Sequence, residues 1–69
     1  MMDKKNIIVL GAIEFKSIAV GFQALDQMVK VAPIQIIDAR TISSGKYLII
    51  FSGDVASVEY AYRIGIETG

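Results

Sequence analysis

Residues 34–51 read IQIIDARTISSGKYLIIF, and this stretch decides the fold because it places two strands side by side in the chain. β-branched residues dominate its first half, where Asp38 and Arg40 alternate with apolar residues, which predicts a strand with one wet face. Residues 43–45 carry the small, polar composition of a turn, and the apolar run over residues 46–51 predicts the next strand. We therefore expect a β-hairpin.

On the N-terminal side, residues 7–13 form a near-continuous apolar run that is typical of a strand buried on both faces. We expect this strand to be the first and to be central in the sheet. Gly11 within it indicates a bend or a close approach of another group. A helix is expected over residues 17–32, with Ser17 as its N-cap, and its apolar face carries Ile18, Phe22, Leu25, Val29 and Ala32.

On the C-terminal side, Asp54 is expected to cap a second helix, whose apolar face carries Val55, Val58, Ala61 and Tyr62. The order β-α-β-β-α predicts a mixed α/β (α+β), ferredoxin-like domain, the front of the split β-α-β motif. In that motif a final strand pairs beside the first strand. Residues 1–69 are therefore expected to be a single domain that is truncated before its last strand, or a neighbouring molecule supplies the missing pairing.

The composition of the chain predicts oligomerisation. Of its 69 residues, 54% are hydrophobic and 20% are charged. Soluble domains contain about 45–50% apolar and about 25% charged residues, and a domain of this size buries only about 60% of its unfolded surface. We therefore expect other subunits to cover part of the apolar surface.

Several function classes are excluded by residue counts. Seven Lys and Arg balance seven Asp and Glu, so the basic excess typical of nucleic-acid binding is missing. The chain has no cysteine and no histidine, which excludes disulfides, thiolate metal sites, cysteine nucleophiles and histidine-based triads. The longest apolar run, residues 7–13, is too short to span a bilayer and lacks the flanks of a signal peptide. We expect a cytoplasmic protein that binds no membrane.

A specific family pattern joins these elements. Its motifs are G-A-I-E at 11–14, A-V-G at 19–21, L-D-Q-M-V-K-V-A at 25–32, I-S-S-G-K at 42–46 and G-D-V at 53–55. In this order and spacing, they resemble the bacterial microcompartment shell-protein domain over nearly all of residues 7–69. The stretch after the second strand most resembles the first domain of the tandem-domain, trimer-forming shell proteins of the propanediol-utilisation type. Members of that group with an iron–sulfur cluster have a cysteine where Ser43 stands, so a cysteine-ligated cluster is excluded here.

The resemblance implies a structural shell protein without enzymatic activity or cofactor. Shell domains of this family form six-domain rings, as hexamers or as trimers of tandem chains, that tile with other shell proteins around a pore for small metabolites. Ser43, Ser44 and Gly45 would line the pore, although a hairpin turn alone requires such residues. Lys30 would lie at the tile edge, paired with Asp26, although a lysine there also complements the helix dipole.

The remaining polar residues are expected to be structural. Glu14 is interpreted as a hydrogen-bonding carboxylate, because no base, nucleophile or metal set accompanies it or Asp54. The three tyrosines are expected in packing or subunit contacts: Tyr47, Tyr60 and Tyr62. A dimeric, ligand-binding regulatory domain of the ferredoxin-like type remains the alternative function, because a fold does not fix a function.

Overall fold

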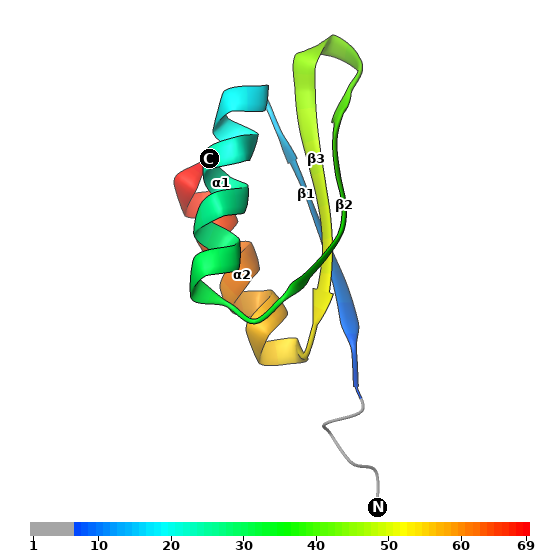
Figure 1. Ribbon diagram of the computed structural model, residues 1–69, viewed down its shortest axis with the longest axis vertical. Coiled ribbons are helices and arrows are strands. Elements are labelled where there is room, and N and C mark those ends of the chain that lie inside the picture. The colour runs from blue at the N-terminus through cyan, green and yellow to red at the C-terminus, as the bar shows by residue number, and fades with distance from the viewer. Residues whose placement is uncertain (1–6) are drawn as a thin grey trace, which may run out of the picture.

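The computed structural model describes residues 7–69, in which one antiparallel sheet is covered on one face by two helices (Figure 1). The elements follow the predicted β-α-β-β-α order. They are β1 (Val9–Phe15), α1 (Ile18–Val31), β2 (Gln35–Ile42), the 3₁₀ turn η2 (Ser43–Gly45), β3 (Lys46–Gly53) and α2 (Val55–Thr68). The mixed α/β fold and the hairpin are thereby confirmed.

Strand β3 is the centre of the sheet, whose order is β1-β3-β2. Both neighbours run antiparallel to it. In the sheet formed by residues 7–69, β1 is therefore an edge; the central position expected for it requires the final strand of the motif, which the described residues do not contain. The prediction of two buried faces is wrong, because Ile13 and Phe15 are buried while Leu10 and Ala12 are exposed. An apolar run alone does not distinguish these cases, since the exposed positions also carry apolar side chains.

Strand β2 keeps its charged residues on the face of the sheet that is away from the helices. A register shift between Ile36 and Asp38 takes Ile37 out of the pairing. Beyond this bulge, Asp38 lies opposite Ile50 and Arg40 lies opposite Leu48. The predicted wet face of this strand is confirmed.

The core lies between the sheet and the helices. Its members are Ile13, Phe15, Ala24, Met28, Ala32, Tyr47, Ile49, Phe51, Val58 and Ala61. Gly11 pairs directly with Phe51 across the sheet, and a Cβ at Gly11 would lie 2.6 Å from the Phe51 Cζ. The close approach predicted at this glycine is thus an aromatic ring lying over its backbone.

Both helices begin at the predicted caps. The Ser17 hydroxyl accepts a hydrogen bond from the Val20 N–H at 3.2 Å, and α1 ends at the C-cap Ala32, directly before Pro33. The Asp54 carboxylate accepts from the Ser57 N–H at 2.8 Å. These contacts satisfy N–H groups that the first turn of a helix leaves without a partner.

The predicted apolar faces of the helices are partly wrong. Helix α1 buries Gly21, Ala24 and Met28, while Ile18, Phe22 and Val29 are exposed. Helix α2 buries Val58, Ala61 and Gly65, while Val55 and Tyr62 are exposed. Helix α1 packs closely on Tyr47 at Gly21, and α2 packs closely on Ile13 and Met28 at Gly65, so these contacts select small residues over large apolar ones.

We expect Gly21→Ala to destabilise the fold. A Cβ at this position would overlap the Tyr47 side chain, including its Cβ, which is held by the backbone of β3 and has little freedom to move. Overpacking costs about 1–3 kcal/mol, and we expect about 2–3 kcal/mol here because the crowded Tyr47 atoms are held near the backbone; the helix propensity of alanine recovers about 1 kcal/mol. Urea unfolding should show a net loss of about 1–2 kcal/mol, whereas Gln23→Ala, at an exposed position of α1, should show none. A Gly21→Ala variant as stable as the parent would contradict this packing.

The Asp54 cap makes the stability of α2 dependent on acid pH. Hydrogen bonds from the Ser57 N–H and hydroxyl lower the pKa of Asp54 below its ordinary value of 3.8. A lowered folded-state pKa adds stability above pH 3.8, and this stability is lost as the pH falls through the folded pKa. We expect the destabilisation caused by Asp54→Ala to be largest at pH 7 and to shrink as the pH falls below 3.8. A difference that does not depend on pH would contradict a role for the carboxylate charge.

Candidate functional site

The η2 turn lies at the tip of the hairpin, beyond the ends of the helices (Figure 1). Ser43, Ser44 and Gly45 are all exposed there. Ser44 has a φ of 67° and Gly45 has a φ of 72°, a left-handed conformation that costs a serine about 1 kcal/mol or more. The turn predicted over residues 43–45 is confirmed. Its tip exposes two serine hydroxyls and backbone groups, and its side chains are small.

Lys30 lies near the C-terminal end of α1 and forms the ion pair with Asp26 that the sequence predicted. Its Nζ is 3.0 Å from the Asp26 Oδ2, and the two side chains are 63% and 57% exposed. An exposed i,i+4 pair of this kind contributes a few tenths of a kcal/mol. The structure does not bring Lys30 and the η2 turn together, because they occupy different ends of the molecule (Figure 1).

The remaining candidate polar residues do not form a catalytic cluster. Glu14 is exposed on the sheet with its Oε1 4.0 Å from the Lys46 Nζ, so it makes a loose ion pair and not the hydrogen bond that we expected. Asp54 acts as the cap of α2. Tyr47 is in the core, and the exposed Tyr60 ring has the Arg63 guanidinium 5.9 Å from its centre. Over residues 7–69, no group of three potential metal ligands occurs.

Sequence reasoning missed an apolar surface on the face of the sheet that is opposite the helices. The strand register places Leu10, Ala12, Leu48, Ile50 and Ile42 on this surface, which we call the outer face. Charged residues of the same face form the pairs Arg40–Asp38, at 3.2 Å, and Lys46–Glu14. Alternation was visible in the sequence only for the β2 strand, and the outer face appears only when the three strands are placed in register.

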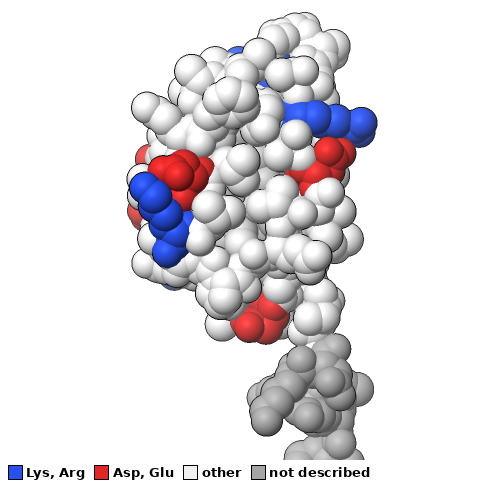
Figure 2. Space-filling model, viewed as in Figure 1, with Lys and Arg blue, Asp and Glu red and all other residues white. Residues whose placement is uncertain are grey.

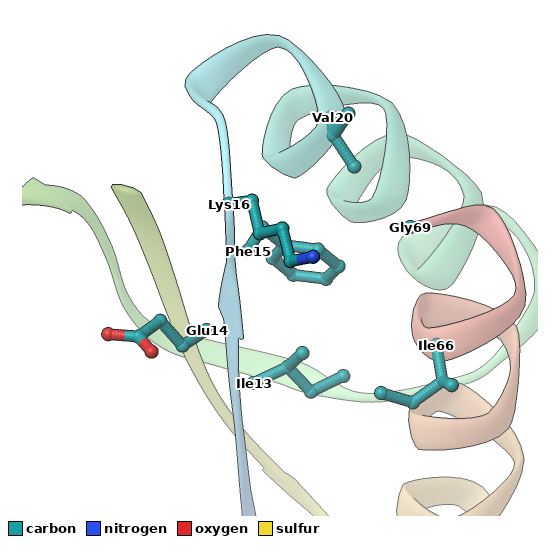
Figure 3. A pocket seen from close by; sticks show the side chains of 7 residues that line it. All are labelled: Ile13, Glu14, Phe15, Lys16, Val20, Ile66 and Gly69. Atoms are coloured by element: carbon teal, nitrogen blue, oxygen red, sulfur yellow. The ribbon is translucent and has the colours of Figure 1, made fainter. Parts of the chain in front are cut away.

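A groove also follows β1 on the side away from β3. Leu10, Gly11 and Ala12 form its floor beside the α2 residues Val58, Glu59, Tyr62 and Arg63. A second hollow is lined by Ile13, Phe15, Lys16, Ile66 and Gly69. Figure 3 shows Ile13 and Ile66 pointing toward each other across this second hollow, while Glu14 points to the opposite side of β1.

Charge is sparse on the face of the molecule that Figure 2 shows. In the view of Figure 2, basic atoms lie beside acidic ones, and broad uncharged areas separate these groups. This distribution offers no continuous basic stripe for a nucleic-acid backbone on the face shown.

None of the helices in the described part of the chain is long and apolar enough to cross a membrane.

A family model and individual proteins of known name match this chain, and they agree with one another. A family model of the BMC domain matches residues 9–69. The chain is 39% identical over 56 residues to the bacterial microcompartment shell protein PduT of Citrobacter freundii, across 81% of this chain and 30% of PduT. It is 35% identical over 60 residues to the carboxysome shell protein CcmK2 of Synechocystis sp., across 87% of this chain and 58% of CcmK2.

A solved structure agrees with these matches. The crystal structure of a microcompartment protein from Desulfitobacterium hafniense has a TM-score of 0.87 and 34% identity, covering 90% of this chain and 34% of that chain. The chain thus spans between 30% and 58% of the length of the two shell proteins above. The match over residues 9–69, with the same fold in a microcompartment protein, confirms the family resemblance: the chain belongs to the BMC-domain family of bacterial microcompartment shell proteins.

Proposed function

We propose that this chain is a structural tile of a bacterial microcompartment shell and performs no chemistry. It assembles into a six-domain ring, from single chains or from tandem ones, and the ring contacts other shell proteins at its edges. Small polar metabolites cross the shell through a pore at the centre of the ring. Its relatives PduT and CcmK2 are named as shell proteins, which supports this role.

The outer face of the sheet is the observation that carries the proposal. Leu48, Ile50 and Ile42 lie on it, beside the highly exposed Leu10. Removing such a surface from water contributes about 25 cal/mol per Å². Its charged neighbours are already paired within the chain, so burial against another subunit leaves no unpaired charge. This face suits the contact between neighbouring domains of a ring.

The η2 turn suits a pore. Its three side chains are small, so several copies can converge on an axis and leave an opening. Serine hydroxyls and exposed N–H groups line such an opening with polar, uncharged groups that favour polar or anionic solutes. Ser43, Ser44 and Gly45 are exposed at the hairpin tip, where they are free of the core.

Native mass spectrometry of the full chain tests the ring. We expect an assembly of six domains for the parent, and Ile50→Lys on the outer face should lower the ring population by about tenfold, because each copy would bury an unpaired ammonium. Gln23→Lys adds the same charge at an exposed position of α1 and should leave the ring intact.

Two results would contradict the ring. One is a ring that tolerates Ile50→Lys. The other is a parent that forms only dimers and gains melting temperature with a small ligand, which would favour the regulatory alternative.

Lys30 is proposed as the lateral contact between rings. Its long stem can lie along a flat edge while its ammonium donates to carbonyl groups across it, and Asp26 holds it in place from one turn earlier.

We expect Lys30→Ala to preserve the ring and to raise the protein concentration needed for sheet formation by about tenfold, or about 1.4 kcal/mol for each ring that joins a sheet. Electron microscopy of negatively stained sheets measures this concentration. Lys16→Ala removes another exposed lysine and serves as the control. Sheets that form equally well without Lys30 would disprove the edge contact.

A further inference from the structure

Helix α1 carries a row of apolar residues that stays open to water in residues 7–69. Ile18, Phe22, Leu25 and Val29 follow one another at helical spacing, so they lie along one side of α1. We call these residues the α1 stripe. Phe22 is 56% exposed and Val29 is 46% exposed, whereas Leu25 is partly buried against the core. Large apolar side chains that remain exposed along one side of a helix indicate a contact surface.

The α1 stripe lies on the side of α1 that is away from α2. Within residues 7–69, α2 lies mainly over β1, and α1 lies mainly over β3. Exposed side chains cannot lie between two packed helices, and the Phe22 ring meets the buried Tyr47 ring of β3 edge to face, with 5.1 Å between the ring centres. Because β2 is the next strand beyond β3, the stripe lies beside the helix-facing side of β2, which carries Ala39 and the exposed Thr41.

This surface is prepared for an apolar partner. The contact with Tyr47 holds the Phe22 ring in place, so little side-chain entropy is lost when a partner covers it. Lys30 and Asp26, next to the stripe, are paired with each other at 3.0 Å, so burial beside them leaves no unpaired charge. Figure 2, in a view that looks onto α1, shows an uncharged area between two groups of charged atoms.

We propose that the α1 stripe, together with the adjoining side of β2, binds the outer face of a second copy of this chain. This inference rests on the proposed ring and names its second contact surface. A closed ring of identical domains needs a head-to-tail contact between two different surfaces, because a surface that binds itself closes a dimer instead. The outer face is one of these surfaces, and its Leu48 and Ile50 would cover Phe22 and Val29 of the next copy.

The fold favours the α1 stripe over the other exposed apolar groups as this second surface. Leu10, Tyr62 and Ile66 border the side of β1 along which the split β-α-β motif places its final strand. The α1 stripe lies toward β2, at the opposite edge of the described sheet, so the final strand of the motif does not cover it.

The two surfaces also have the directions that a ring requires. Helix α1 begins near the η2 end of the molecule and ends near the opposite end (Figure 1). The outer face extends the same way, from Ile42 beside η2 toward Leu10. A contact that aligns the two surfaces therefore keeps the η2 turns of neighbouring copies together. The outer face points away from the helices, while the stripe points sideways from α1, so the two surfaces enclose a wedge-shaped domain that can close a ring.

A charge placed on the α1 stripe tests this surface. In native mass spectrometry of the full chain, Val29→Lys should lower the ring population about tenfold, because Asp26 can pair with only one of two neighbouring ammonium groups and the other is buried unpaired. Gln23→Lys adds the same charge at an exposed position outside the stripe and should leave the ring intact. Circular dichroism verifies the fold of both variants. A ring that tolerates Val29→Lys would overturn the proposal.

A mixture of two defective variants tests which surfaces meet. Val29→Lys leaves the outer face intact, and Ile50→Lys leaves the α1 stripe intact. One sound contact can therefore form between the two variants, but no ring can close. We expect native mass spectrometry of the mixture to show at least about tenfold more dimer than either variant alone, with one copy of each variant in the dimer.

The other outcomes are decisive as well. Dimers of Ile50→Lys alone would mean that the stripe binds itself, and dimers of Val29→Lys alone would mean that the outer face binds itself. Either result, or a mixture that gains no dimer, would overturn the proposed pairing. The parent chain, measured beside the variants, separates the two proposals: a parent ring without mixed dimers removes only the pairing, whereas a parent without a ring removes the proposed function as well.

Discussion

The structure depends on the packing of small helix residues against large side chains of the central strand β3 and of its neighbour β1. Tyr47, Ile49 and Phe51 point from the central strand toward the helices and are buried there. Gly21 lets α1 approach Tyr47, and Gly65 lets α2 approach Met28 and Ile13. Because β3 also pairs with both other strands, a change that moves it disturbs the sheet and the helix layer together.

This packing explains which parts of the fold were predictable from the sequence. Helix limits follow from local chemistry, and Ser17 and Asp54 make the hydrogen bonds expected of caps. Which face of a helix is buried depends on the sheet below it. The positions of large apolar residues therefore predicted a buried Phe22, which is exposed, and did not include Gly21, which is buried. Hydrophobic periodicity identifies a helix more reliably than it identifies the face that the helix buries.

Among the candidate surfaces, those formed by residues close in the sequence were predictable, and those formed by several strands and helices were not. The η2 turn and the Lys30–Asp26 pair involve residues at most four positions apart, and local sequence rules found both. The outer face combines residues from β1, β2 and β3, and the groove combines β1 with α2. Neither surface was predictable without the strand order.

The charges and the apolar surface have different roles in association. The three described ion pairs, Lys30–Asp26, Arg40–Asp38 and Lys46–Glu14, are each formed within one chain and are exposed to water. Pairs of this kind contribute at most about 1 kcal/mol each, so they do little to hold a 69-residue fold together. The free energy available for assembly lies instead in exposed apolar side chains such as Leu10, Ile8 and Phe22. Apolar burial is not directional, so the few charges beside these surfaces determine how two subunits are oriented. A charge that is already paired can be buried in a contact, whereas two like charges that face each other disfavour that orientation.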